Sequence, residues 1–233
     1  GTNSFSQATR LWATYYGGTG TELVYDVATD ASGNVYVTGY TGSTTGIASG
    51  GFQNTYGGGL WDAFLVKFNS AGARLWATYY GGTGDEPVYD IATDASGNVY
   101  LAGQTESTTG IASGGFQNVS GGGTFDAFLV KFNAAGARQW ATYYGGTGDD
   151  YGTGVATDAS GNVYLGGYTP STTDIASGGF QNSYGGTGDA FLVKFNAAGV
   201  RQWATYYGGT GDDYGYAVSS DASGNVCLSG MTI

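Results

Sequence analysis

The chain has 233 residues, of which 41% are hydrophobic, so it is long and apolar enough to bury a core. Its 7 basic and 18 acidic residues give a net charge of −11, which excludes the basic surface that nucleic acid requires. No run of about 18 apolar residues occurs, so we also expect no membrane insertion.

The chain repeats one unit four times. The segment at residues 11–18 returns with small changes at 75–82, 139–146 and 202–209. One tryptophan marks each copy, at a spacing of 64, 64 and 63 residues: Trp12, Trp76, Trp140 and Trp203. A fixed period of this length predicts one supersecondary unit that buries its apolar faces only against its neighbours. We therefore expect a single repeat domain over residues 1–233.

Each repeat contains four predicted strands. In the second repeat these are residues 88–93, 98–103, 127–132 and 139–144, each bounded by glycine, asparagine or aspartate. No segment has a sustained 3.6-residue apolar period, so essentially no helix is expected. Four short strands that are apolar on both faces are typical of a propeller blade, which is covered by another blade on either side.

Taken in chain order, the strands predict an all-β propeller with four blades. Three blades are complete, at residues 24–80, 88–144 and 154–207. The fourth is predicted to combine strands at 216–220 and 225–230 with N-terminal strands from residues 1–16, so that the two chain ends close the ring. Two alternatives stay open: a dimer whose chains share blades in an eight-bladed ring, or a segment of a longer propeller.

The segment DAFLVKFNAAGARQWATYYGGTGDDYGTGVATDASGNVYLGGYT, at residues 126–169, resembles the bacterial beta-propeller repeats called SBBP repeats. The resemblance extends over essentially the whole chain, and the strand order is similar to that of NHL-type blades. It implies an extracellular or cell-surface bacterial protein, usually without enzymatic activity.

Acidic residues cluster where each repeat passes to the next. They are Glu22, Asp85, Glu86, Asp149, Asp150, Asp212 and Asp213. We expect these connections to approach the central axis, where a ring of carboxylates would suit Ca²⁺. The competing interpretation is that they are solvated turn residues, so that the protein needs no cofactor.

The same face is predicted to carry the ligand site, because its loops are longer and richer in tyrosine, amide and acidic residues. Candidate ligand residues are Tyr151, Tyr214 and Tyr216. With no histidine to act as a base, no catalytic residues are predicted. We expect a non-enzymatic structural or adhesive interaction module with a protein or glycan partner. The alternative is a multivalent carbohydrate-binding propeller with one site between each pair of blades.

Overall fold

The computed structural model describes residues 9–221 and 223–233, and these contain β-strands and no helix. The first blade consists of β1 (Glu22–Thr29), β2 (Val35–Thr41), β3 (Asp62–Phe68) and β4 (Arg74–Tyr80). The second consists of β5 (Val88–Thr93), β6 (Val99–Thr105), β7 (Asp126–Phe132) and β8 (Arg138–Tyr144). The third consists of β9 (Tyr151–Thr157), β10 (Val163–Thr169), β11 (Asp189–Phe195) and β12 (Arg201–Tyr207). A two-stranded sheet of β13 (Asp213–Ser220) and β14 (Val226–Thr232) follows.

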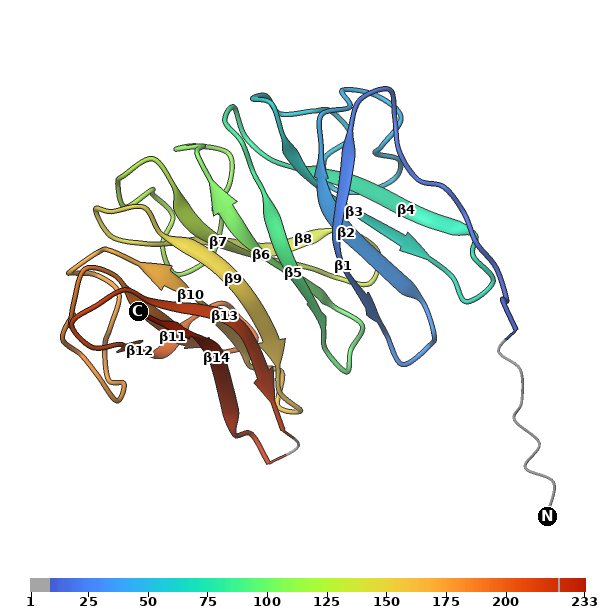
Figure 1. The fold of residues 1–233 in the computed structure, drawn as a ribbon. Coiled ribbons are helices and arrows are strands. Elements are labelled where there is room, and N and C mark those ends of the chain that lie inside the picture. Colours follow the sequence, from blue (N-terminus) through green and yellow to red (C-terminus); the bar gives the residue numbers. More distant parts are fainter. Residues whose placement is uncertain (1–8, 222) are drawn as a thin grey trace, which may run out of the picture.

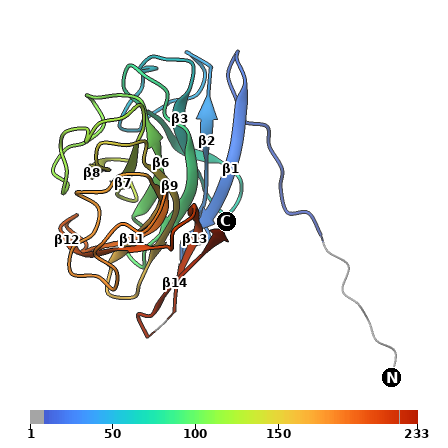
Figure 2. The same cartoon turned by 60° about the vertical axis from the view of Figure 1, so that its left-hand side comes forward.

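The four sheets follow one another in an arc (Figure 1). Neighbouring strands in every sheet are antiparallel and follow chain order. The first strand of each sheet is innermost, and the packing contacts run from β1 to β5, then to β9 and β13. Figure 2 shows β13 beside β9, with β14 at the end of the arc. Blade after blade therefore buries its faces against the next, as the repeat period predicts.

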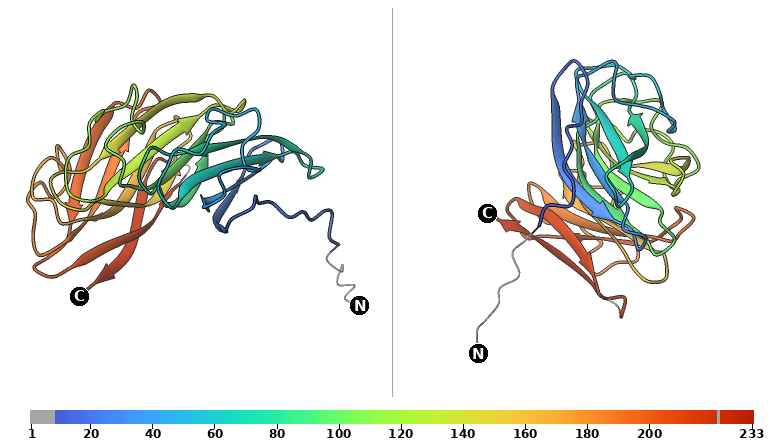
Figure 3. Two further views of the ribbon diagram at one scale, coloured as in Figure 1. Left: turned by 90° about the horizontal axis from the view of Figure 1, so that it is seen from above. Right: turned by 90° about the vertical axis from the view of Figure 1, so that its right-hand side faces the viewer.

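The predicted closure of the fourth blade is wrong for the described residues. In the described part of the chain, β13 and β14 pair only with each other. Residues 11–16, the predicted outer strand of that blade, form no strand, and residues 1–8 lie outside the described residues. The strand pair and the N-terminal segment lie at opposite ends of the arc (Figure 3). A sheet edge closes only when its partner strand reaches it, and within the described residues β13 is the one strand paired with β14.

The N-terminal segment nevertheless occupies the place of a preceding blade's outer strand. The Trp12 indole N–H donates to Ser70 O (3.1 Å), as Trp76 donates to Ala134 O (3.1 Å) one blade later. The Tyr16 hydroxyl donates to Ile47 O (2.7 Å), a contact that the matching tyrosines of the next two blades repeat. The repeated text therefore sets the packing of a segment against its neighbour even where no sheet forms.

Tight turns at the face opposite the long loops fix the register of the first two strands in each blade. In the first turn, Asp30 Oδ1 accepts from the N–H groups of Ser32 (2.9 Å) and Asn34 (3.0 Å), while Gly33 has a φ of 74°. This is an Asx-type turn in which glycine supplies the left-handed conformation. These turns thus have a complete structural explanation as hairpin turns.

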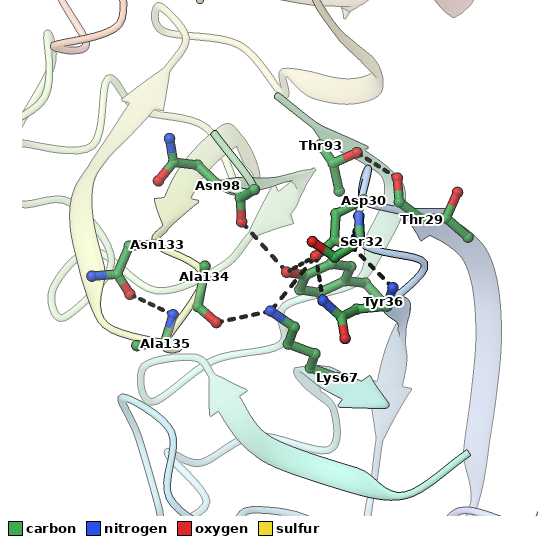
Figure 4. Close-up of polar contacts among 12 residues, drawn as sticks. Thr29, Asp30, Ser32, Tyr36, Lys67, Thr93, Asn98, Asn133, Ala134 and Ala135 are labelled. Carbon is green, nitrogen blue, oxygen red and sulfur yellow. Dashed lines mark hydrogen bonds and ion pairs between the residues drawn. The ribbon is translucent and has the colours of Figure 1, made fainter. Parts of the chain in front are cut away.

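The same turn is tied to the next blade by a lysine (Figure 4). Lys67 Nζ lies 3.7 Å from Asp30 Oδ2 and donates to Ala134 O (3.0 Å) in the second blade. The Tyr36 hydroxyl also donates to Asp30 Oδ2 (3.1 Å), and its ring lies under the lysine. The lysine of an ion pair buried within the first blade therefore links that blade to the second by a hydrogen bond, on the face opposite the long loops.

Candidate functional site

A cavity of about 550 Å³ opens among the innermost strands, on the side of the long loops. Five tyrosines line it: Tyr89, Tyr151, Tyr168, Tyr214 and Tyr216. Gln104, Thr153 and Gly215 complete the lining. The structure thus brings together all three candidate ligand tyrosines of the sequence. We call this site the tyrosine cavity.

These side chains share one wall on the packed strands β9 and β13. Tyr151 and Thr153 are two residues apart on β9, and Tyr214 and Tyr216 are two residues apart on β13. A β-bulge shifts the register of each strand at Thr153 and at Tyr216, and all four side chains line the cavity. Gly215 lies between Tyr214 and Tyr216, where a Cβ would come within 2.7 Å of the backbone oxygen of Gly167. A glycine is therefore required for β13 to approach the third blade this closely.

The aromatic rings of this wall are stacked. The rings of Tyr168 and Tyr214 have centroids 4.4 Å apart and planes 13° apart. Tyr216 follows at 6.2 Å from Tyr214, with planes 18° apart. Tyr151 lies 6.0 Å from Tyr168 at a steeper angle of 43°. Because parallel rings 4.4 Å apart cover each other's faces, this row of rings offers a ligand its ring edges and the outer face of a terminal ring.

Hydrogen-bonding groups of the tyrosine cavity are neutral. The Tyr89 hydroxyl donates to Gln104 Oε1 (3.0 Å), and the Thr153 hydroxyl donates to Gly215 O (2.6 Å). Burial raises the pKa of Tyr89 and of Tyr168 to about 12, so both phenols keep their protons at neutral pH. The cavity therefore offers hydroxyl and amide groups beside aromatic rings, and its lining carries no charge.

The tyrosine cavity is one site and not a repeated one. The positions of Tyr151 and Tyr214 are held by Leu23 in the first repeat and by Pro87 in the second. Sequence reasoning missed Tyr168, although it pairs directly with Tyr151 across β9 and β10. A β-bulge at Thr153 shifts this register by one residue, so counting back from the hairpin turn pairs Tyr168 with Gly152 instead.

The seven acidic residues predicted to bind calcium are not brought together. Within residues 9–221 and 223–233, no three histidine, cysteine, aspartate or glutamate residues form a group that could hold a metal ion. Glu86 and Asp150 are fully buried and Asp213 is nearly so. Calcium binding therefore stays a prediction from the sequence.

Each of these acids instead accepts hydrogen bonds from a nearby loop. Glu86 accepts from Thr105 Oγ1 (2.7 Å) and from the Gly82 N–H (2.9 Å), and burial raises its pKa to about 7. Asp150 accepts from the Gly146 N–H (2.8 Å), and its pKa is likewise raised to about 7 by burial. The five remaining acids accept as follows: Asp213 from Gly209 N, Asp85 from Leu60 N, Asp149 from Thr124 N, Asp212 from Thr187 Oγ1, and Glu22 from Thr41 Oγ1 and Ser43 Oγ.

Comparison with known families identifies the repeat. The model of the SBBP beta-propeller repeat matches residues 11–46, 75–109 and 139–174. The chain thus contains three SBBP beta-propeller repeats. The described part contains no helix long and apolar enough to cross a membrane.

Two curated proteins are similar to the chain. An uncharacterized WD repeat-containing protein, L264, of Acanthamoeba polyphaga mimivirus is 26% identical over 89% of this chain and 17% of its own length. The regulatory protein FlaEY of Caulobacter vibrioides is 30% identical over 60% of this chain and 15% of its own length. The chain thus spans less than a fifth of each of these relatives.

Proposed function

We propose that the chain is a non-enzymatic interaction module that binds a neutral carbohydrate in the tyrosine cavity. The observation that carries the proposal is the stacked wall of Tyr168, Tyr214 and Tyr216 beside uncharged hydroxyl and amide groups. The SBBP repeats and the WD repeat-containing relative support an interaction module over an enzyme. This choice takes carbohydrate binding from the alternative expectation, but with a single tyrosine cavity in place of one equivalent site between each pair of blades.

The chemistry of the cavity suits a sugar. The C–H face of a pyranose ring is apolar and packs on an aromatic ring, while its hydroxyl groups need neutral donors and acceptors at the rim. Gln104 and Thr153 lie at positions to supply them. An acidic ligand is disfavoured, because the chain carries a net charge of −11 and the cavity has no basic side chain.

An extracellular or cell-surface location belongs to the same proposal. It is supported by the resemblance to bacterial SBBP proteins and fits a module that adheres to glycans. Whether one chain acts alone or two chains share blades is part of this proposal too, because the edge of β14 offers unpaired backbone groups to a further strand.

A glycan array probed with the whole chain tests the proposal. We expect binding to neutral glycans, with at least a tenfold loss of affinity in Tyr214→Ala. Tyr15→Ala is the matched control, because Tyr15 is fully exposed and lies outside the cavity. Unfolding temperatures of both variants show whether the fold persists. If Tyr214→Ala binds as tightly as the original chain, the cavity is not the site. If no glycan binds, a structural or adhesive contact with a protein becomes the leading function.

A further inference from the structure

A second cleft, of about 450 Å³, lies at the seam between the second and third blades. Its walls include Phe116, Gln117 and Gly145 from the second blade and its connection, and Asp174, Ser177 and Arg201 from the third. We call it the seam cleft. It shares no lining residue with the tyrosine cavity, so the two can be altered separately.

Asp174 has an unusual backbone. Its φ is 69°, and among the described residues it is the one non-glycine residue with a positive φ. The matching positions of the first two repeats are Gly46 and Gly110, with φ of 88° and 86°. Glycine adopts this left-handed conformation freely, whereas a residue with a Cβ does so at an energetic cost. Strain of this kind at the edge of a cleft points to a role for the side chain.

The Asp174 carboxylate is exposed and available to a ligand. It accepts one hydrogen bond from Thr173 Oγ1 (3.0 Å), on the residue before it. The ion pairs of the described residues join Lys67 to Asp30 and Lys194 to Asp158, and neither involves the seam cleft. A carboxylate so placed can accept hydrogen bonds from two further hydroxyl groups.

Arg201 is held firmly in the same cleft. Its Nη1 donates to Ile175 O (3.3 Å), and its guanidinium lies 4.2 Å from the centre of the Phe116 ring. A guanidinium has five N–H donors in a fixed plane, so it can hold the loop and a ligand together. The cleft thus offers a fixed donor and a carboxylate acceptor beside an aromatic ring.

The seam between the first two blades is a natural control. There Arg138 Nη1 donates to Ile111 O (3.0 Å) and lies 4.4 Å from the centre of the Phe52 ring. The arginine, the aromatic ring and the carbonyl are the same, but Gly110 takes the place of Asp174. The carboxylate is therefore the feature that sets the second seam apart from the first.

We propose that the seam cleft is a second carbohydrate site, in which Asp174 and Arg201 hold adjacent hydroxyl groups of a neutral sugar. The assignment of a sugar as the ligand rests on the proposed function, whereas the choice of Asp174 and Arg201 rests on the geometry of the seam cleft. The carboxylate offsets the charge of the guanidinium, so the cleft favours a neutral sugar over an acidic one. Two sites of different chemistry would let one chain hold a branched or extended glycan at two points.

Backbone amide shifts of the ¹⁵N-labelled whole chain test this proposal, with glucose, galactose and mannose as separate probes. We expect at least one hexose to shift Ser177 in the seam cleft and Gly215 in the tyrosine cavity. In Asp174→Gly the shift of Ser177 should be lost or need at least a fivefold higher concentration, while that of Gly215 persists. This variant restores the residue of the matching seam, so its unfolding temperature should be unchanged or higher.

Two further variants sharpen the test. Asp174→Asn keeps an acceptor without the charge and should retain part of the affinity, whereas Gly110→Asp should create hexose-dependent shifts at the first seam. If Asp174→Gly leaves the Ser177 titration unchanged, or if only Gly215 responds in the original chain, the seam proposal is overturned while the proposed function stands. A response of Ser177 without Gly215 keeps the seam site and rejects the tyrosine cavity, and no response at either position rejects both.

Discussion

The second blade and the strand pair β13–β14 have closely similar sequences but very different burial. All seven residues of β6 are buried, whereas the matching strand β14 has no buried residue. Tyr144, at the end of β8, is fully buried by Phe191 and Phe195 of the next blade. Its counterpart Tyr207 is 63% exposed. A residue at a given position of the repeat therefore belongs to the core where another blade covers it, and to the surface where none does.

The largest contrast is expected for leucines at matching positions of β6 and β14. Leu101 is fully buried, so Leu101→Ala should lower the free energy of unfolding by about 2–5 kcal/mol. Leu228 is only partly buried, so Leu228→Ala should cost about 1 kcal/mol. Urea unfolding of both variants measures the difference. Equal losses would mean that β14 is covered in solution, by another chain or by the N-terminal segment.

A smaller contrast is expected for the two tyrosines. Tyr144→Phe removes the hydrogen bond to Ile175 O (2.6 Å) in a buried seam and should cost about 1–3 kcal/mol. Tyr207→Phe should change the free energy of unfolding by less than about 0.5 kcal/mol, because that side chain is exposed. Thermal unfolding of the two variants side by side tests this. A large loss for Tyr207→Phe would place a buried partner over β12.

The first seam should respond to pH through a pair of carboxyl groups that the last seam lacks. The Ile91 N–H donates to both Asp26 Oδ2 (3.2 Å) and Asp90 Oδ1 (2.9 Å), so two carboxyl groups face each other between β1 and β5. Burial, together with Asp26, raises the pKa of Asp90 to about 7. In an unfolded chain the pKa of the same carboxyl group is about 4.

Because the folded pKa is raised, the protonated carboxyl favours the folded state. This contribution is complete below about pH 4 and is lost as the pH rises through 7. The free energy of unfolding, measured from pH 4 to 8, should therefore fall over this window, and Asp90→Asn should flatten the fall. The later repeats carry Gly154 and Ala217 at this position, so their inner strands lack the effect. An unchanged profile in Asp90→Asn would assign the titration to other buried acids.

The smallest contrast concerns the phenylalanines at the outer rim. Phe52 lies against Arg138 and Phe132 of the next blade, and Phe52→Ala should cost about 1 kcal/mol. Phe180, its counterpart in the third blade, is 87% exposed, and its replacement should stay within about 0.5 kcal/mol. Chemical unfolding again provides the measurement. Equal costs would show that the rim contact between blades contributes nothing.

Three of the eight residues that line the tyrosine cavity were candidates from the sequence, and the tertiary structure brings the other five to them. The spacing of Tyr214 and Tyr216 on one strand indicates a shared face, and the structure places both in one cavity. Tyr89 and Gln104 come from the second blade, two sheets before β13, and their distance from β13 depends on how the blades pack. The sequence analysis did not single out Asp174, which replaces Gly46 and Gly110 of the earlier repeats, and its left-handed backbone became evident in three dimensions.

The sequence by itself determined the strands, the turns and the period of the repeat. It predicted residues 88–93 as a strand, and β5 occupies Val88–Thr93. These features depend on side-chain alternation and on turns such as the one at Asp30, whose hydrogen bonds span four residues. The tertiary structure decided the open arc, the strand pair that no further strand extends, and the two clefts. Those features depend on contacts between residues that lie one repeat or more apart, and near-identical repeats do not specify which of their edges will meet.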